Sequence, residues 1–210
     1  SPWTLACYMV EGRSSKTWID VKTCAYKNSA LMHQILDQLT TSIIHYLNAQ
    51  IEAGVDALML FDTWGGALSY VTYSEFSLKY MARIAREVKR EHCGKRIPLV
   101  FFTKHANPWL EQLAASGCDA VGLDYTIDIA SAKQRIGEQV ALQGNLDPHI
   151  LLGSDSLIEA EVNRILAAYQ GDTGFVFNLG HGIDKSTPIT GVETMLAALR
   201  TQDQIHRTGK

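Results

Sequence analysis

The stretch Ala57-Leu-Met-Leu-Phe-Asp-Thr-Trp-Gly-Gly66 decides the fold class of this chain. An apolar run leads into Asp62, Thr63 and a Gly-Gly turn. A continuous apolar run that ends at a turn signal predicts a strand buried on both faces, as in parallel sheets. The polar residues after such a strand are expected at the C-terminal edge of the sheet, where α/β proteins place their binding sites. The alternative is that Asp62 and Thr63 only cap the next helix.

The same pattern recurs along the chain. Further short apolar runs predict strands at residues 98–103, 120–124, 140–144 and 174–178. Between them lie helical patterns, among them an amphipathic stripe from Leu31 to Leu47 and possible capping boxes at Thr72/Glu75 and Ser156/Glu159. The apolar segment 2–10 is expected to be the end of a strand and its loop. Strands that alternate with helices predict a parallel sheet.

The number of units leaves two architectures open. Five or six βα units could form an open doubly wound sheet or most of a (β/α)8 barrel, and a closed barrel needs more strands than this chain supplies. No G-x-G-x-x-G motif follows a strand, so nothing supports a dinucleotide-binding fold. Without an internal linker or low-complexity segment, residues 1–210 are expected to form a single domain.

The composition indicates an ordinary globular protein. The chain has 210 residues, of which 46% are hydrophobic and 20% charged, with a net charge of −3. No apolar run reaches membrane-spanning length, and no basic stripe suggests a nucleic-acid partner. The isolated cysteines Cys7, Cys24, Cys93 and Cys118 fit reduced thiols in the cytoplasm better than a disulfide framework. Ser1 is not a natural start, so the chain is expected to be the interior of a longer protein.

Polar side chains gather at the predicted strand ends. His181 stands out there, because glycines on both sides would let the backbone approach a ligand and leave the ring exposed. The motifs H-x-C and H-E-x-x-H and paired cysteines are missing from these strand ends, so zinc binding is not expected.

Five motifs together make the chain recognisable. They are Ser-Pro-Trp-Thr-Leu…Tyr-Met-Val-Glu-Gly at 1–12, Phe-Asp-Thr-Trp-Gly-Gly at 61–66, Gly-Leu-Asp-Tyr at 122–125, Leu-Gln-Gly-Asn-Leu-Asp-Pro at 142–148 and Asn-Leu-Gly-His-Gly at 178–182. In this order and spacing they resemble the uroporphyrinogen decarboxylase family in its bacterial form. The resemblance covers essentially the whole chain.

The resemblance implies a cytosolic, dimeric (β/α)8 barrel of haem biosynthesis that removes the four acetate carboxyls of uroporphyrinogen III. It implies no cofactor, because a pyrrole protonated at its α-carbon can itself accept the electrons of the leaving carboxylate. Carried over by motif, the substrate-binding residues are Tyr8, Thr63 and His181. We expect them to converge on one cleft at the C-terminal ends of the strands. Asp124 and Asn145 are expected nearby as structural supports that hydrogen-bond loop backbone.

The resemblance also implies that part of the site lies outside this chain. The family's catalytic Asp and its arginine-rich propionate loop belong to a region upstream of Ser1, so residues 1–210 alone are expected to be inactive. Arg13 and the stretch Lys104-His-Ala-Asn107 depart from the family pattern and predict altered loops. Two other functions remain open: a zinc-dependent corrinoid methyltransferase of the same barrel superfamily, and a non-catalytic porphyrinogen-binding fragment.

Overall fold

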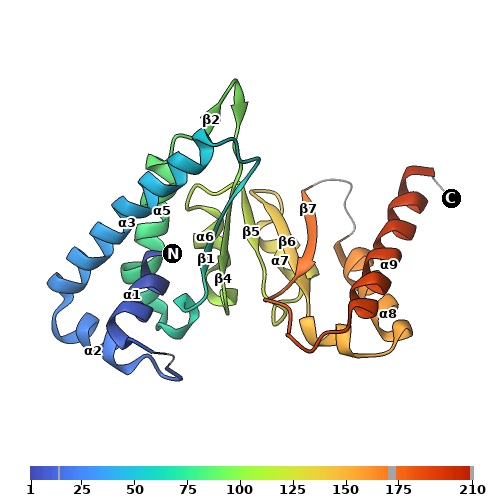
Figure 1. Ribbon diagram of the computed structural model, residues 1–210, viewed down its shortest axis with the longest axis horizontal. Helices are drawn as coiled ribbons and strands as arrows, with labels where there is room; N and C mark the ends of the chain where they lie inside the picture. The colour runs from blue at the N-terminus through green and yellow to red at the C-terminus, as the bar shows by residue number, and fades with distance from the viewer. Residues whose placement is uncertain (14, 170–173, 209–210) are drawn as a thin grey trace. The chain divides into compact units, whose positions relative to one another are not determined.

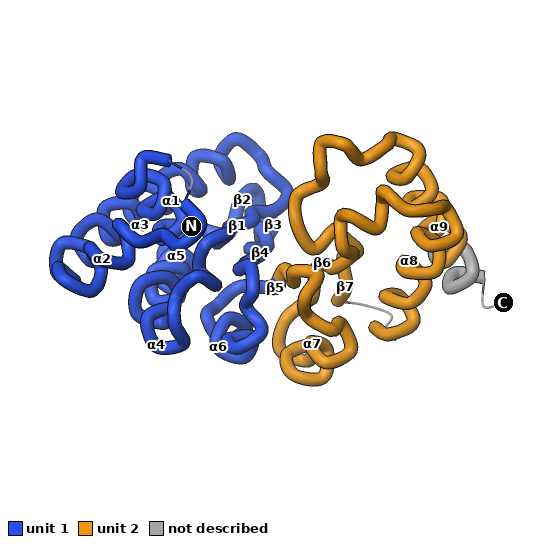
Figure 2. The backbone as a smooth tube through the Cα atoms, turned by 90° about the horizontal axis from the view of Figure 1, so that it is seen from below, with its two compact units in different colours: residues 1–121 blue, residues 122–210 orange. Residues whose placement is uncertain are grey.

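The computed structural model describes residues 1–13, 15–169 and 174–208 (Figure 1). The chain divides into two compact units, Ser1–Val121 and Gly122–Lys210 (Figure 2). In the described part of the chain, no helix is both long and apolar enough to cross a membrane.

The strands confirm the predicted parallel α/β class. They are β1 (Leu58–Asp62), β4 (Leu99–Thr103), β5 (Ala120–Gly122), β6 (Ala141–Leu146) and β7 (Phe175–Leu179), and they form a sheet in the order β1-β4-β5-β6-β7. The β1–β4 and β6–β7 pairs are parallel, with Leu58 opposite Leu99 and Leu142 opposite Phe175. Apart from the small β2–β3 sheet, neighbours in space follow chain order. This order fits the barrel alternative, because a doubly wound sheet reverses its order at a switch point.

Burial of β1 differs from the expectation of a strand covered on both faces. Leu58, Leu60 and Asp62 are buried, whereas Phe61 is 52% exposed. Successive side chains of a strand point to opposite faces, so β1 buries one face more completely than the other. The continuous apolar run concealed this alternation because Phe61, on the exposed side, is itself apolar.

Besides its strands, unit 1 contains a series of helices, the first of which starts at Pro2. These are α1 (Pro2–Glu11), α2 (Ile19–Lys27), α3 (Ser29–Glu52), α4 (Tyr70–Tyr73), the π-helix η2 (Ser74–Leu78), α5 (Lys79–Glu87) and α6 (Leu110–Ala114), with 3₁₀ turns η1 (Gly65–Ala67) and η3 (Asn107–Trp109). The core they bury includes Trp3, Leu36, Ile84 and Phe101.

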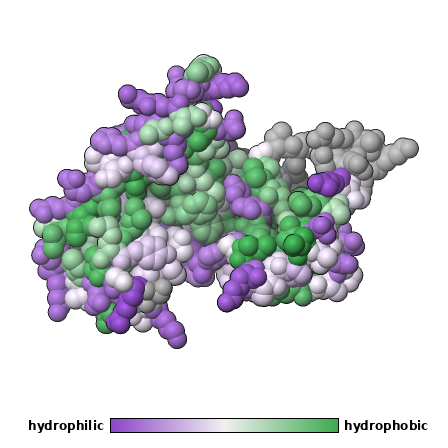
Figure 3. Space-filling view, in the orientation of Figure 1, coloured by the Kyte–Doolittle hydropathy of each residue, from purple (hydrophilic) through white to green (hydrophobic). Residues whose placement is uncertain are grey.

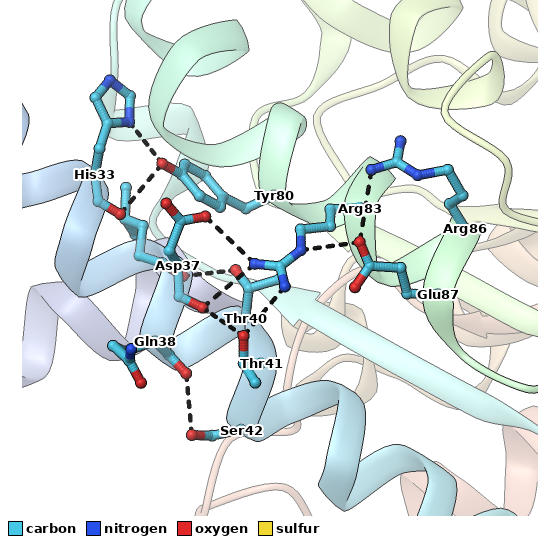
Figure 4. Close-up of polar contacts among 11 residues, drawn as sticks. His33, Asp37, Gln38, Thr40, Thr41, Ser42, Tyr80, Arg83, Arg86 and Glu87 are labelled. Carbon is cyan, nitrogen blue, oxygen red and sulfur yellow. Dashed lines mark hydrogen bonds and ion pairs between the residues drawn. The ribbon is translucent and has the colours of Figure 1, made fainter.

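Helices α3 and α5 are joined by polar contacts across their shared face (Figure 4). The Arg83 guanidinium on α5 donates to Asp37 Oδ1 at 3.3 Å and to Thr41 Oγ1 at 3.2 Å on α3. The Tyr80 hydroxyl lies 2.6 Å from Nδ1 of His33. Burial, and then the nearby Asp37 carboxylate, raise the pKa of Tyr80 to about 12. These contacts fix the register of two helices that are far apart in sequence.

The segment before α5 begins earlier than the capping-box pattern predicted. The capping box is Ser69/Thr72, so α4 starts at Tyr70, and the Thr72/Glu75 prediction is wrong. The Glu75 carboxylate instead contacts His33, with Oε1 at 3.2 Å from Nε2. Thr72 takes the place of the usual Glu because its hydroxyl also reaches the Ser69 backbone nitrogen, at 3.0 Å.

A hairpin that the sequence analysis did not anticipate precedes β4. Strands β2 (Glu91–His92) and β3 (Lys95–Arg96) pair antiparallel around Cys93-Gly94, both of which have positive φ. The Asp119 carboxylate joins residues on both sides of this hairpin. It accepts from Arg90 at 2.6 Å, from Arg96 at 2.8 Å and from the Leu99 amide at 2.8 Å. Burial alone would raise the pKa of Asp119, but the Arg96 and Leu99 hydrogen bonds and the Arg90 charge lower it below its usual value.

Unit 2 continues the strand–helix alternation. Its helices are α7 (Ile129–Ile136), the 3₁₀ segment η4 (Pro148–Leu152), α8 (Asp155–Tyr169) and α9 (Ile189–Thr208). Asp128 caps α7 by accepting from the Ser131 amide at 2.8 Å. Helix α8 starts at Asp155 and Ser154 Oγ accepts from the Leu157 amide, so the predicted Ser156/Glu159 capping box is wrong by two residues.

Candidate functional site

Tyr8 lies on helix α1, and the expectation that residues 2–10 end a strand is wrong. Ser1 Oγ accepts from the Thr4 amide at 3.1 Å, and Pro2 stands in the first turn. Gly12 ends the helix at φ 61°, with its amide bonded to the Tyr8 carbonyl. A Ser-Pro start and a Gly stop are helix boundary signals, so the sequence contained the correct reading.

The Tyr8 side chain is 46% exposed and borders an aromatic cluster. Its ring lies edge-on to Trp18 at 5.9 Å and to Trp64 at 6.4 Å, and the two indoles are 4.5 Å apart. Leu5 and Met9 on the same helix are also exposed, and apolar surface is visible over the N-terminal helices of unit 1 (Figure 3). One edge of the phenol is thus supported while the rest is accessible.

Thr63 follows β1 directly and is partly exposed at the strand's C-terminal end, as predicted. Its neighbour Trp64 belongs to the aromatic cluster around Tyr8. The structure therefore brings Tyr8 and the Thr63–Trp64 turn together within unit 1.

The Asp62 side chain, at the last position of β1, is fully buried. Its Oδ1 accepts from Ser1 Oγ at 2.6 Å and from Thr4 Oγ1 at 3.1 Å, and its Oδ2 accepts from Ser77 Oγ at 2.6 Å. The partners of its side chain are therefore hydroxyl groups of α1, of the N-cap residue Ser1 and of η2, not the amides of the helix that follows. Hydroxyl donors satisfy the carboxylate, as a buried acceptor requires.

This carboxylate influences its buried neighbours. Burial, followed by the charge of Asp62, raises the pKa of the Cys7 thiol and of the Tyr73 phenol. The Tyr73 hydroxyl lies 3.0 Å from Thr103 Oγ1 at the end of β4. Both groups therefore stay protonated near neutral pH.

His181 lies just beyond β7 in unit 2 and is partly exposed. Its Nδ1 accepts from the Gly182 amide at 2.6 Å. The two flanking glycines differ in role. A Cβ at Gly180 would lie 2.3 Å from the Tyr125 nitrogen, whereas one at Gly182 would meet nothing within 4 Å. Gly180 thus lets the turn pack against the β5 end, whereas the space beside the Gly182 Cα is open.

Asp124 and Asn145 make the backbone hydrogen bonds that were predicted for them. Asp124 Oδ1 accepts from the Thr126 amide at 2.8 Å and also from the Thr126 hydroxyl. Asn145 Nδ2 donates to the Asp124 carbonyl at 3.0 Å and to the Ile127 carbonyl at 2.6 Å. Asp124 is fully buried and Asn145 nearly so. They hold the loop after β5 to the end of β6.

A pocket of about 330 Å³ opens beside this loop in unit 2. Its lining includes Tyr125, Asp128, Asn145, Asp147 and Arg164. Asp128 and Asp147 accept from backbone amides at the starts of α7 and η4, and Arg164 pairs with Glu161 at 2.9 Å. The pocket is polar, and these lining groups stabilise the local fold.

No three His, Cys, Asp or Glu side chains gather as metal ligands among the residues that the structure describes. Residues 104–107, for which the resemblance predicts an altered loop, include His105 at φ 60°. A Cβ on Gly66 would lie 2.1 Å from the Lys104 carbonyl oxygen, so this loop packs against the Gly-Gly turn after Thr63.

The sequence analysis missed the residues that support the site. Trp18 and Trp64 contact the Tyr8 ring, and Thr4 bonds to Asp62 and Trp64 on either side of Thr63. The sequence offered one signal for these residues: Trp64 directly follows Thr63, and Trp18 follows the motif that contains Tyr8. The convergence of His181 with Tyr8 and Thr63 stays a prediction, because His181 belongs to the other unit.

Comparison with known proteins gives one family. The model described as uroporphyrinogen decarboxylase (URO-D) matches residues 1–202. Similar curated proteins include the uroporphyrinogen decarboxylase of Coxiella burnetii, 54% identical over 95% of this chain and 55% of that protein. Those of Ruthia magnifica and Vibrio cholerae are 57% and 56% identical over 87% and 90% of this chain, and 53% of each relative is covered.

A solved structure shares the fold. A methyltransferase from Methanosarcina mazei superposes with a TM-score of 0.80 over 98% of this chain and 57% of that chain, at 25% identity. This chain spans about half the length of the curated relatives it matches. With the family model matched over residues 1–202 and relatives more than 50% identical, this chain belongs to the uroporphyrinogen decarboxylase family.

Proposed function

We propose that this chain, within a protein of its relatives' length, takes part in converting uroporphyrinogen III to coproporphyrinogen III. The observation that carries the proposal is the family match over residues 1–202, which includes Tyr8, Thr63 and His181. The relatives named above are uroporphyrinogen decarboxylases. Their identity to this chain exceeds the 25% of the methyltransferase, so decarboxylation is the better supported chemistry.

The reaction needs a temporary acceptor for the electrons of the breaking bond. Protonation of a pyrrole α-carbon makes the ring cationic. The acetate C–C bond then breaks, carbon dioxide leaves, and the bonding electrons neutralise the ring. A proton added at the former methylene carbon gives the methyl group, and the α-carbon proton is lost. One proton is consumed for each carbon dioxide released, and the substrate itself acts as the electron sink.

This chain would contribute polar contacts to a flat substrate with many carboxylates. The Tyr8 and Thr63 hydroxyls can donate to substrate carboxylates, and His181 can do so in either charge state. The exposed apolar side chains beside Tyr8 would lie against the ring edges. We propose that the catalytic carboxylate and the propionate-binding arginines come from the remainder of the full-length protein. Asp62 and Asp124 do not supply that carboxylate, because each is fully buried and hydrogen-bonded.

The test is turnover of freshly reduced uroporphyrinogen III by the full-length protein and by residues 1–210 alone, each confirmed by mass. We expect coproporphyrinogen III from the full-length protein and none above background from residues 1–210. No turnover by the full-length protein would reject the proposed function. Turnover by residues 1–210 would show that this chain holds its own catalytic group.

The two other functions predict different results. A corrinoid methyltransferase would contain stoichiometric zinc, measured by elemental analysis of the full-length protein. A porphyrinogen-binding module would bind the substrate without turnover.

We further propose a cytoplasmic homodimer whose protomers each form a single domain. Sedimentation and cell fractionation test the assembly and the location, and a single cooperative unfolding transition tests the domain.

A further inference from the structure

We propose that Thr4, acting with Asp62, is a positioning residue for the substrate site. It ties helix α1, which carries Tyr8, to the turn that carries Thr63. The inference rests on the proposed function for its kinetic consequence, but the tie itself is a structural relationship that can be tested without substrate.

The Thr4 hydroxyl bonds to two points of the same turn. Its Oγ1 donates to Asp62 Oδ1 at 3.1 Å and accepts from the Trp64 amide at 3.2 Å. These residues lie on either side of Thr63, and Thr4 itself is only 7% exposed. A single hydroxyl from α1 therefore bonds the side chain of the residue before the predicted substrate-binding threonine and the backbone of the residue after it. A second bond from the same helix supports this attachment, because Trp3 Nε1 donates to the Trp64 carbonyl at 3.1 Å.

Asp62 is itself held in place. Ser77 Oγ donates to its Oδ2 at 2.6 Å, and Ser1 Oγ donates to its Oδ1 at 2.6 Å. Ser77 belongs to the π-helix η2, a geometry that recurs near functional sites. Gly65 closes the remaining side, because a Cβ there would collide with Oδ2. The carboxylate that Thr4 meets is therefore held by η2 and by the Gly65 turn as well as by the N-cap of α1, so the bond restrains α1 relative to these elements.

The constraint reaches Tyr8 through the helix. Tyr8 lies four residues after Thr4, on the same helical face. Its ring lies against Trp64, the residue whose amide Thr4 binds, at a centroid distance of 6.4 Å. Rotation of α1 would therefore move the Tyr8 hydroxyl relative to Thr63. Both Thr4 and Asp62 are buried, so they act through the substrate-binding residues rather than by touching the substrate.

The first experiment compares Thr4→Val with Thr40→Val in the full-length protein. Valine keeps the shape of threonine but can neither donate nor accept. Thr40 is the matched control, because it is fully buried and its hydroxyl bonds within its own helix, to the Leu36 carbonyl at 2.6 Å. We expect Thr4→Val to lower kcat/KM on the order of tenfold per folded molecule, because misplaced binding groups lose orientation. Thr4→Ser keeps the hydroxyl and should restore the wild-type value.

The second experiment tests the attachment of α1 to the Thr63 turn without measuring turnover. Near-ultraviolet circular dichroism reports on the packing of all aromatic side chains, and the close pair Trp18 and Trp64, whose rings are 4.5 Å apart, contributes to it. We expect Thr4→Val to change this signal and Thr40→Val to leave it unchanged. If Thr4→Val does not fold, Ser77→Ala replaces it. Its control is Ser116→Ala, which loses a hydroxyl bonded locally to the Leu113 carbonyl at 2.6 Å.

The outcomes separate this proposal from the proposed function. Reduced kcat/KM with rescue by serine and an altered tryptophan signal support the positioning role. Equal kcat/KM for Thr4→Val and Thr40→Val overturns it. If the wild-type protein does not turn over uroporphyrinogen, the proposed function fails, and the tryptophan signal alone decides the tie. An unchanged signal in Thr4→Val then overturns the tie, and a changed signal supports it.

Discussion

Gly65 packs directly against the carboxylate of Asp62. A Cβ atom on Gly65 would lie 1.9 Å from Asp62 Oδ2 and 2.7 Å from its carboxyl carbon. Because three hydroxyls fix that carboxylate, it cannot move aside without losing hydrogen bonds. The second position of the Gly-Gly pair is restricted as well, by the Lys104 carbonyl. The turn after β1 therefore requires glycine for lack of space rather than for a positive φ.

Gly65→Ala is expected to destabilise unit 1. Overpacking of this kind typically costs about 1–3 kcal/mol, and the rigidity of Asp62 favours the upper end. Chemical denaturation measures the change in free energy of unfolding. Gly182→Ala is the matched control, because its added methyl group meets nothing within 4 Å. Equal stability of the two variants would show that Asp62 relaxes freely and that the turn is not constrained.

Substitution of His181 by Asn is expected to affect turnover more than stability. The ring is partly exposed, and its Nδ1 accepts from the amide of the adjacent Gly182. We expect slower turnover or accumulation of partly decarboxylated porphyrinogens, measured by chromatography of the oxidised products. His149→Asn is the control in the same unit, with a side chain that is 62% exposed and lies 3.2 Å from Asp147. An unfolded His181→Asn protein with normal activity per folded molecule would contradict the prediction.

Asp124→Asn is expected to lower stability but not turnover per folded molecule. The amide retains one acceptor for the Thr126 amide but loses the charge that strengthens two hydrogen bonds, so the cost is about 1 kcal/mol. Asp128→Asn is the control, because Asn caps helices as well as Asp does. Loss of turnover at an unchanged melting temperature would mean that Asp124 acts in the reaction.

Asp119→Asn is expected to reduce the stability of unit 1 in a pH-dependent way. The carboxylate joins Arg90, Arg96 and the Leu99 amide, and its loss costs about 1–3 kcal/mol near neutral pH. Since the folded-state pKa is lowered, this stabilisation is complete above the unfolded pKa of about 3.9 and is lost as the pH falls through the folded pKa.

Denaturation curves of wild type and Asp119→Asn should therefore converge at acid pH. Glu161→Gln serves as the control, because its partner Arg164 is 56% exposed and such pairs contribute little. A constant stability difference between wild type and Asp119→Asn over the whole acid range would contradict the lowered pKa.

Sequence patterns alone were sufficient for the alternation of strands and helices, because strand runs, caps and glycine stops are local signals. The expected strand at 98–103 became β4, and Asn28 caps α3 through a local hydrogen bond from the Leu31 amide. Local patterns were misleading where two readings compete. Segment 2–10 is apolar enough for a strand, but Ser1, Pro2 and Gly12 make it a helix.

The family and the identity of Tyr8, Thr63 and His181 as candidate residues followed from the sequence by itself, because motifs are preserved in residue type and order. Only the tertiary structure decided what Asp62 does. Its neighbours in sequence suggest a cap or a site, whereas its partners Thr4 and Ser77 lie 58 and 15 positions away. Long-range hydrogen bonds depend on how helices pack on a sheet. No local pattern encodes that packing, so the roles of Thr4, Asp62 and Trp64 became visible only in the folded chain.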